Sequence, residues 1–340
     1  MSVPSEHAAP ADAAPTLKGR RASWSRYWQT GAIHSCAESF EGRLGEQARA
    51  FWERVFAPLH DEDRVLELGA GNGAVSRFLV ETLMFSRRLE VHAVDLATLK
   101  PDWHTRLPPQ LQAAVRFHSG VNIEKLPFED SSIGCIVSQF AIEYADQEAA
   151  WSEVLRVASP FARLGMILHH RDAVPVENGV EELAHLERLL QDGGAYDQVA
   201  KLIPYASLVG SEAGRLRLQS DPDATAARDR YNSTVRQLLA VAEQSSCPDI
   251  LLQATQGLAE ALSLAQRQGR KAARDFLAAQ HLALEDSKIR LAEIAHYALD
   301  GEQMTAVARR LVEGGFSKVD YMPLSENGHL YAWCLTAART

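Results

Sequence analysis

The stretch Arg64-Val-Leu-Glu-Leu-Gly69-Ala-Gly71-Asn-Gly73 decides the fold. Residues 64–69 form a short apolar pattern typical of a strand, and the glycines lead into a helical pattern over residues 74–83. Glycine lets the backbone turn tightly and approach a ligand, and the first turn of a helix offers free N–H groups. The stretch therefore predicts a strand, a ligand-binding loop and a helix in succession.

The spacing of this loop indicates which ligand it binds. The glycines follow the pattern G-x-G-x-G, whereas the dinucleotide-binding fingerprint is G-x-G-x-x-G. Glu67 stands two positions before the first glycine, and an acid there suits a cationic ammonium group better than a pyrophosphate. Asp95 ends the next strand pattern, where a carboxylate can accept hydrogen bonds from both hydroxyls of a ribose. A nucleoside ligand is therefore expected, with a positive charge favoured by Glu67.

Strand patterns alternate with helical ones through the first half of the chain, at residues 64–69, 89–95, 114–118, 133–138 and 162–170. Such alternation indicates parallel βαβ units. The C-terminus adds a helical pattern over residues 304–314 and two strand patterns, 317–323 and 330–336, around the hairpin signal Asn327-Gly328. The predicted fold class is α/β, with all of these strands in one seven-strand, mostly parallel sheet flanked by helices.

Residues 176–298 interrupt this alternation. They contain amphipathic helical patterns at residues 180–190, 226–243, 250–267 and 270–299 and almost no strand pattern. We expect a helical insertion between strands five and six, covering the crevice at the carboxyl ends of the strands where open α/β sheets bind ligands. A dimerisation surface is the alternative role, which leaves a homodimer open. The leucine, alanine and tyrosine content of the block favours an apolar or aromatic guest.

Composition excludes several other classes. The chain has 340 residues and a formal net charge of −9, with Lys and Arg scattered rather than gathered in a basic stripe, which argues against nucleic-acid substrates. No apolar run approaches the roughly 20 residues that span a bilayer, and residues 1–16 lack the basic start and apolar core of a signal peptide. The cysteines, Cys36, Cys135, Cys247 and Cys334, are widely spaced and predict neither a metal site nor disulfides. A cytoplasmic protein without membrane partners is expected.

The motifs resemble those of the class I S-adenosylmethionine-dependent methyltransferase family. The similarity continues through residues 124–128 and 130–138, which look like the stretch leading into strand four of that family, then residues 139–144 and 154–157. It covers about residues 60–172, and residues 303–340 look like the closing strand pair. Gly134 departs from the usual acid in strand four, and Ser159-Pro-Phe161 from the usual Pro-Gly-Gly turn. The resemblance implies S-adenosylmethionine as cofactor.

It also implies where the cofactor lies. Glu67 and the glycine loop correspond to the residues that hold the methionine end, Asp95 to the ribose ligand, and Ser138 and Gln139 to the border of the sulfonium. Asn122 stands where the family often has an aspartate facing the adenine amino group. The full set of expected cofactor-binding residues is Tyr27, Trp28, Glu67, Gly69, Ala70, Gly71, Gly73, Asp95, Leu96, Asn122, Ile123, Ser138 and Gln139.

The aromatic cluster Trp24, Tyr27 and Trp28 resembles the N-terminal lid helix of many small-molecule methyltransferases. Rings near a sulfonium stabilise its charge through cation–π contact. The alternative is an apolar staple that covers the core. The chain is accordingly divided into a disordered tail, lid helices, a Rossmann-like core and a helical cap, at residues 1–20, 21–60, 61–172 with 303–340, and 173–302.

Candidate catalytic residues follow strands four and five. His169 and His170 come at the end of strand five, where a neutral imidazole can take a proton from an acceptor. Alternation along a strand points them to opposite faces, and His170, which lies farther out, is preferred. Glu143 reaches the same crevice but could equally cap the next helix. Methyl transfer often needs only positioning and desolvation, so both histidines could be structural.

The sequence thus predicts transfer of a methyl group from S-adenosylmethionine to oxygen, nitrogen or carbon of a small, apolar or aromatic metabolite. One alternative keeps the cofactor without methyl transfer, as another enzyme or a regulatory module. The other is a dinucleotide-dependent oxidoreductase, which the loop spacing disfavours.

Overall fold

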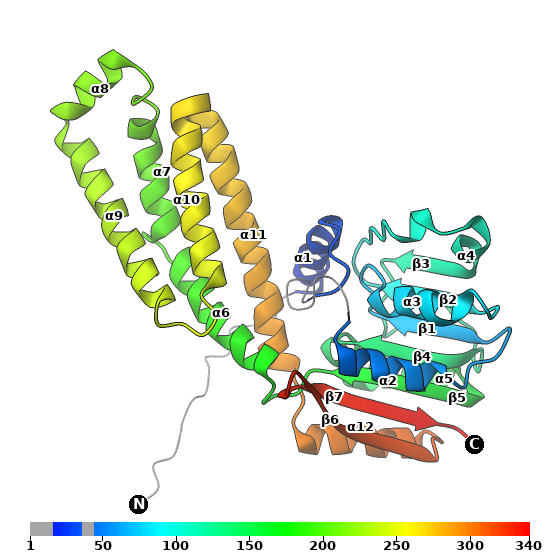
Figure 1. Ribbon diagram of the computed structural model, residues 1–340. Coiled ribbons are helices and arrows are strands. Elements are labelled where there is room, and N and C mark those ends of the chain that lie inside the picture. The colour runs from blue at the N-terminus through cyan, green and yellow to red at the C-terminus, as the bar shows by residue number, and fades with distance from the viewer. Residues whose placement is uncertain (1–15, 36–43) are drawn as a thin grey trace, which may run out of the picture.

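The computed structural model describes residues 16–35 and 44–340. Residues 1–15 of the predicted tail lie outside the described residues, as does Cys36, whereas residues 17–20, predicted as disordered, form the start of a helix. The described chain forms a sheet flanked by helices and a long helical arm that projects from one end of it (Figure 1). None of the described helices combines the length and apolarity needed to cross a bilayer.

The sheet has seven strands in the order β3-β2-β1-β4-β5-β7-β6. β1 to β5 run parallel, and β7 lies antiparallel between β5 and β6. This confirms the predicted seven-strand, mostly parallel α/β fold. The strands are β1 (Arg64–Leu68), β2 (Glu90–Asp95), β3 (Val115–Ser119), β4 (Ile133–Gln139), β5 (Ala158–Leu168), β6 (Lys318–Glu326) and β7 (His329–Ala338).

Alternate strand residues face the two layers of helices, as the period of a strand requires. Leu66 and Ile136 pack with α5 (Gln147–Val157) and α12 (Gly301–Glu313) on one face. Val65 and Val137 pack with α2 (Glu46–Phe56) and α3 (Ala74–Leu79) on the other. Because both faces are covered, the central strands are buried along nearly their whole length, which explains their continuous apolar runs.

The sheet domain also contains shorter elements. A π-helical turn (Val80–Met84) extends α3, and helix α4 (Pro109–Ala114) precedes β3. Short 3₁₀ turns span His104–Arg106 and Ile142–Tyr144.

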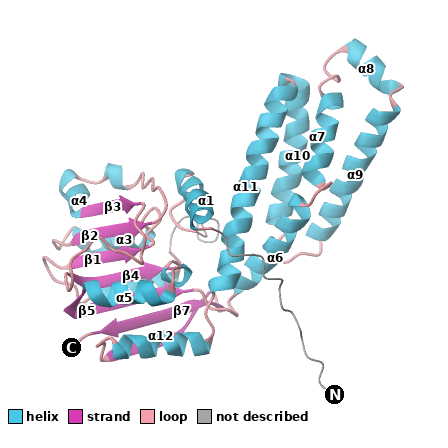
Figure 2. Ribbon diagram, turned by 180° about the vertical axis from the view of Figure 1, so that it is seen from behind, coloured by secondary structure: helices cyan, strands magenta, loops and turns pink. Residues whose placement is uncertain are grey.

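The arm is entirely helical (Figure 2). It consists of α6 (Val174–Leu190), α7 (Ala195–Ala206), α8 (Glu212–Gln219), α9 (Pro222–Ala242), α10 (Asp249–Gln268) and α11 (Arg270–Tyr297). Its helices share an apolar cluster of their own, separate from those of the sheet. The chain leaves and rejoins the sheet domain at one place, because His170 and Leu299 form a parallel bridge. The block is thus an insertion between β5 and β6.

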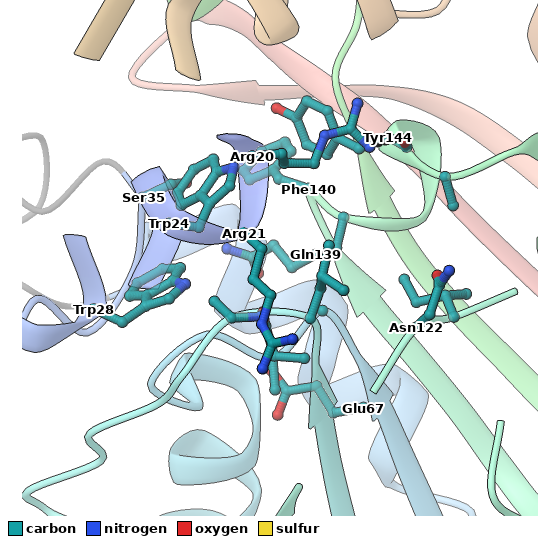
Figure 3. Close-up of a pocket in the computed structure, with 18 of the residues that line it drawn as sticks. Arg20, Arg21, Trp24, Trp28, Ser35, Glu67, Asn122, Gln139, Phe140 and Tyr144 are labelled. Atoms are coloured by element: carbon teal, nitrogen blue, oxygen red, sulfur yellow. Dashed lines mark hydrogen bonds between the residues drawn. The ribbon is translucent and has the colours of Figure 1, made fainter. Parts of the chain in front are cut away.

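Helix α1 (Leu17–Gln29) lies between the sheet domain and α11 (Figure 1). The Arg20 guanidinium pairs with Glu293, and the Arg26 guanidinium makes two hydrogen bonds of 2.5 and 2.6 Å to the Asp286 carboxylate. Both acids belong to α11. α1 is therefore fixed to the arm by charge and covers the carboxyl ends of β1 and β4 (Figures 1 and 3).

Candidate functional site

The glycine loop lies at the carboxyl end of β1. Gly69, Gly71 and Gly73 all have positive φ, at 60°, 53° and 80°, which favours glycine. Space excludes a side chain as well: a Cβ at Gly69 would stand 2.1 Å from the Cβ of Ala141, and one at Gly71 would stand 2.4 Å from the Trp28 ring. The loop is therefore packed beneath α1 as well as turned by its glycines.

Asp95 fixes this loop from the end of β2. Its Oδ2 accepts the Gly71 N–H at 2.7 Å and its Oδ1 accepts the Ala97 N–H at 2.7 Å. Burial raises the pKa of Asp95 to about 6, against these two hydrogen bonds, which favour the charged form. Each carboxylate oxygen keeps a lone pair for a further donor.

Glu67 is buried beneath the same loop. Its Oε2 accepts from both the backbone N–H and the hydroxyl of Ser76, in the first turn of α3. Burial raises the pKa of the Glu67 carboxyl to about 7, and the nearby Asp95 adds to the rise. Two poorly solvated acids thus lie close together, and a bound cation would stabilise their ionised forms.

A first cavity of about 120 Å³ opens above the loop, between α1 and the ends of β1, β2 and β4 (Figure 3). Nine of the residues predicted to bind the cofactor line it: Trp28, Glu67, Gly69, Ala70, Asp95, Leu96, Asn122, Ile123 and Gln139. Tyr144, expected beside Glu143 at this crevice, also lines it, as do Arg20, Arg21 and Phe140, which the sequence did not single out. Arg21 extends from α1 into the cavity, whereas the Arg20 side chain turns toward Tyr144, whose carbonyl its guanidinium contacts (Figure 3).

A second, larger cavity of about 680 Å³ lies between α1, the arm and the β6–β7 hairpin. Trp24 and Ser35 line both cavities, so the two are neighbours. The walls of the second cavity come from α1, α6, α11 and the hairpin, with Ile250 from α10. His169 faces this cavity from the end of β5, and Tyr27 faces it from α1.

His169 is held by a buried carboxylate. Glu143 Oε1 accepts the His169 Nδ1–H at 2.8 Å and the His169 backbone N–H at 3.0 Å. In the neutral imidazole whose Nδ1–H donates to Glu143, the second ring nitrogen, Nε2, carries the lone pair. The Phe140 ring packs on the imidazole at 4.2 Å between centroids, and Phe140 itself adopts a left-handed φ of 55°. Such strain is retained where surrounding contacts determine it, often at functional sites.

His170 lies elsewhere. Its ring stacks on Trp333 at 4.2 Å, and its Nδ1 accepts the Asp172 N–H at 3.0 Å. Burial lowers the pKa of His170. It lines neither of the two cavities. The two histidines do point to opposite sides, as alternation predicts, but His169 is the one that faces a cavity.

With this geometry in place, the chain can be compared with known proteins. Residues 65–160 match a family model described as a methyltransferase domain. Over this stretch, which is less than a third of the chain, the protein is similar to a methyltransferase domain. An uncharacterized methyltransferase of Mycobacterium tuberculosis is 35% identical over 109 residues, which cover 32% of this chain and 41% of that relative. The match thus spans less than half the length of the curated relative.

Solved structures to which the chain is similar include methyltransferases. Geranyl diphosphate C-methyltransferase from Streptomyces coelicolor is 18% identical, with a TM-score of 0.37, over 47% of this chain and 67% of that one. A SAM-dependent methyltransferase from Aquifex aeolicus is 21% identical, with a TM-score of 0.34, over 44% and 74%. The citrinin polyketide synthase CMeT domain is 14% identical, with a TM-score of 0.42, over 87% and 52%.

Four of the predicted cofactor residues do not line the first cavity: Tyr27, Gly71, Gly73 and Ser138. Gly71 lies under Trp28, and a Cβ at Gly73 would meet the Phe117 ring at 2.6 Å. The Ser138 hydroxyl is buried and donates to the Leu68 carbonyl at 3.2 Å. These three residues shape the loop and the end of β4, whereas Tyr27 faces the second cavity.

One cluster in the arm was not expected. Glu181, His185 and Cys247 place their ligand atoms within 4.8 Å of one another, a grouping that could hold a metal ion. The Ser245 hydroxyl stands among them, 2.9 Å from His185 Nε2 and donating to Glu181 at 2.6 Å. Cys247 Sγ lies 3.7 Å from the Asn178 carbonyl. The cluster is thus tied together by hydrogen bonds and joins α6 to the α9–α10 turn.

Proposed function

We propose that this protein transfers the methyl group of S-adenosylmethionine to a small-molecule acceptor bound in the second cavity. The observation that carries the proposal is the adjacency of the two cavities: one is lined by the glycine loop and its two buried acids, the other by His169. The methyltransferase domain that residues 65–160 match supports the same conclusion.

The residues of the first cavity fit the cofactor. The buried Glu67 and Asp95 suit a cationic ligand that carries a ribose, because burial raises their pKa values and a nearby positive charge would offset that effect. Leu96 and Ile123 offer apolar surface for an adenine ring. The Asn122 Nδ2 donates to the Glu124 carboxylate at 3.0 Å and its Oδ1 accepts the Glu124 N–H at 3.2 Å, which fixes the loop at the proposed adenine end. When bound, the cofactor supplies the activated methyl group.

The chain's own residues position the reactants, exclude water from the first cavity and provide a proton acceptor. α1 covers the first cavity with Trp24 and Trp28, whose rings stack at 5.6 Å between centroids, and so excludes water. His169 Nε2 can take the proton of a hydroxyl or amine acceptor, while Glu143 orients the ring and stabilises the imidazolium that forms. His169 therefore replaces His170 as the candidate base.

Calorimetry and product analysis test this proposal. The full-length protein should bind S-adenosylmethionine, and Asp95→Ala should lower the affinity at least tenfold, because both the ribose acceptor and the ties to the loop are lost. Asp102→Ala is the matched control, since this carboxylate is exposed and does not line either cavity. Supplying candidate acceptors should then yield S-adenosylhomocysteine.

The alternatives give different results. Binding of the cofactor without S-adenosylhomocysteine formation from any acceptor would favour a regulatory module. Binding of NADH in place of S-adenosylmethionine would favour an oxidoreductase and overturn the assignment.

A further inference from the structure

The second cavity contains an arginine that its neighbours do not neutralise. Arg290 projects into it from α11, and among the described residues no carboxylate lies within ion-pair distance of its guanidinium. Asp286, one turn away on the same helix, is occupied by two hydrogen bonds from Arg26. Arg290 is thus a cation without a charged partner in the described part of the chain.

The contacts of Arg290 hold it in place without neutralising it. Its guanidinium donates to the Ser23 hydroxyl at 3.2 Å and to the Ser287 hydroxyl at 2.9 Å. It also lies over the Tyr27 ring at 4.7 Å and the Trp24 ring at 5.8 Å. Burial lowers the pKa of Arg290, which reflects the cost of keeping this charge out of water. A half-buried cation that is oriented but has no ion-pair partner among the described residues fits an anionic ligand.

The other charged groups that line this cavity do not form an ion pair with Arg290. The Glu326 carboxylate accepts the Ala48 N–H at 2.8 Å and caps the first turn of α2. Glu182 lines the wall on α6, and the remaining basic side chains of the wall are His169 and His329. The cavity therefore offers one guanidinium for an anion, with acids nearby that oppose a second negative charge. A single carboxylate matches this arrangement better than a phosphate, which carries nearly two charges at neutral pH.

The rest of the wall is mostly apolar or aromatic. Flat rings come from Trp24, Tyr27 and Tyr331, and aliphatic groups from α6, α11 and the hairpin: Val174, Pro175, Leu291, Ile294 and Leu330. Such walls favour a ligand with a planar apolar body, because aromatic side chains stack on rings.

We propose that the acceptor is an aromatic carboxylic acid whose carboxylate pairs with Arg290 and whose hydroxyl or amine group lies toward His169. This inference rests on the proposed function, because it takes the second cavity as the acceptor site. Arg290 and His169 enter that cavity from α11 and from the end of β5, respectively. A planar guanidinium is suited to bind a carboxylate through two parallel hydrogen bonds, which fixes the direction of the ligand as well as its charge.

Direct binding tests the inference without requiring turnover. The full-length protein, saturated with S-adenosylhomocysteine, would be titrated by calorimetry with 4-hydroxybenzoate, 4-aminobenzoate and cinnamate, with the corresponding neutral amides, and with phenyl phosphate. We expect at least one carboxylate to bind and its amide to bind at least tenfold more weakly. Arg290→Gln should remove this preference, and Arg290→Lys should retain part of it, because the charge stays but the planar fork is lost.

Controls separate this inference from the proposed function. Arg228→Gln removes an exposed arginine on α9 and should change nothing. Affinity for S-adenosylhomocysteine in Arg290→Gln should stay within about twofold of the wild type, which also shows that the variant is folded. Equal binding of carboxylates and amides, tighter binding of phenyl phosphate, or no binding of any probe would overturn the carboxylate assignment. S-adenosylhomocysteine formation with some neutral acceptor would still support methyl transfer.

Discussion

The two buried acids beside the glycine loop make the proposed cofactor site sensitive to pH. Burial raises the pKa of Glu67 to about 7 and that of Asp95 to about 6, so both carry protons at pH values where exposed carboxyl groups do not. A raised carboxyl pKa in the folded state means that the native protein binds more protons than the unfolded chain between about pH 4.5 and 7. The contribution of these groups to stability is therefore greatest at low pH and falls as pH rises through their folded pKa values.

A cationic ligand reverses that dependence. We predict that the affinity for S-adenosylmethionine rises from pH 5 to pH 7, because the ligand binds the ionised acids better and each must lose its proton. Calorimetry at constant ionic strength measures this. Glu67→Gln should bind more weakly at pH 7 and lose the upper part of the rise, between pH 6 and 7. An unchanged pH profile in Glu67→Gln would show that ionisation of this carboxyl does not affect cofactor binding.

The two histidines at the end of β5 provide a second comparison between single residues. We predict that His169→Ala lowers kcat by about 10²–10⁴-fold, the usual contribution of a general base, with little effect on cofactor affinity. Glu143→Gln should lower kcat less and shift its pH profile, because the ring stays in place without its ionised partner. The variant His170→Ala serves as the control: it should lose stability through its stacking on Trp333 while keeping activity in the folded fraction.

A larger loss of kcat in His170→Ala than in His169→Ala would contradict this assignment. Position in the sequence could not decide between these residues. Alternation showed that only one of them faces the crevice, but which one depends on the phase of β5 and on the placement of Trp333 against it. Both depend on how a distant strand packs.

At the scale of elements, the link between α1 and α11 is the contact that most affects the site. Glu293 is buried, at 1% exposure, and the Arg20 guanidinium that pairs with it also donates to the Tyr144 carbonyl at 2.7 Å and the Tyr297 hydroxyl at 2.9 Å. Burial raises the pKa of Glu293, while Arg20 counters the rise. Removing either partner therefore leaves a buried charge or polar group without its main contact.

We predict that Arg20→Met destabilises the protein by about 3–5 kcal/mol, the usual result of breaking a buried ion pair from one side. The double variant Arg20→Met/Glu293→Met should recover most of that loss, because no unpaired charge stays behind. Urea unfolding of the single and double variants measures both values. Cofactor affinity should fall in both variants, since Arg20 also lines the first cavity. A double variant no more stable than Arg20→Met would show that the ion pair is not the main support of α1.

Elements with a strong local pattern were predictable from the sequence, and those defined by packing were not. The predicted strand over residues 64–69 and the hairpin at Asn327-Gly328 both occur, because buried apolar runs and a residue pair that tolerates positive φ specify them locally. Helices α7 and α8 were not singled out. α7 carries a proline inside it and α8 is short, so their apolar faces are recognisable only against the other arm helices.

The residues of the candidate site show the same difference between local sequence patterns and distant packing contacts. The loop and Asp95 follow from the sequence because one strand–loop–helix unit holds them close together in the chain. Arg290 and the Glu143–His169 pair do not. Arg290 reaches the site across the long insertion, and His169 meets Glu143 through the pairing of β4 with β5. Contacts between segments so far apart depend on the whole fold.

At the scale of the whole molecule, the arm and the sheet domain meet over a small region. The arm has its own apolar cluster, and its two connections to the sheet domain stand together where the Leu299 N–H donates to the His169 carbonyl at 2.9 Å. Only the root of the arm, through α6, α11 and the start of α10, lines the second cavity. The distal part projects away from the sheet domain (Figure 1). We therefore expect the arm to be required for binding the acceptor and largely dispensable for folding of the sheet domain.

Replacing residues 174–297 with a short Gly/Ser linker tests this expectation. The linker is geometrically feasible because Ala173 and Ala298, which flank the block, belong to one small apolar cluster. We predict that the truncated protein keeps a cooperative thermal transition and binds S-adenosylmethionine with an affinity reduced by about tenfold, since α1 loses Asp286 and Glu293 but the glycine loop and Asp95 stay. Acceptor binding and turnover should be lost, because two walls of the second cavity are gone.

A matched control inserts the same linker at Gly210, in the turn between α7 and α8, and should behave as the wild type in all three measurements. Turnover of the same acceptor by the truncated protein would show that the acceptor lies within the sheet domain, and the second cavity would then not be the acceptor site.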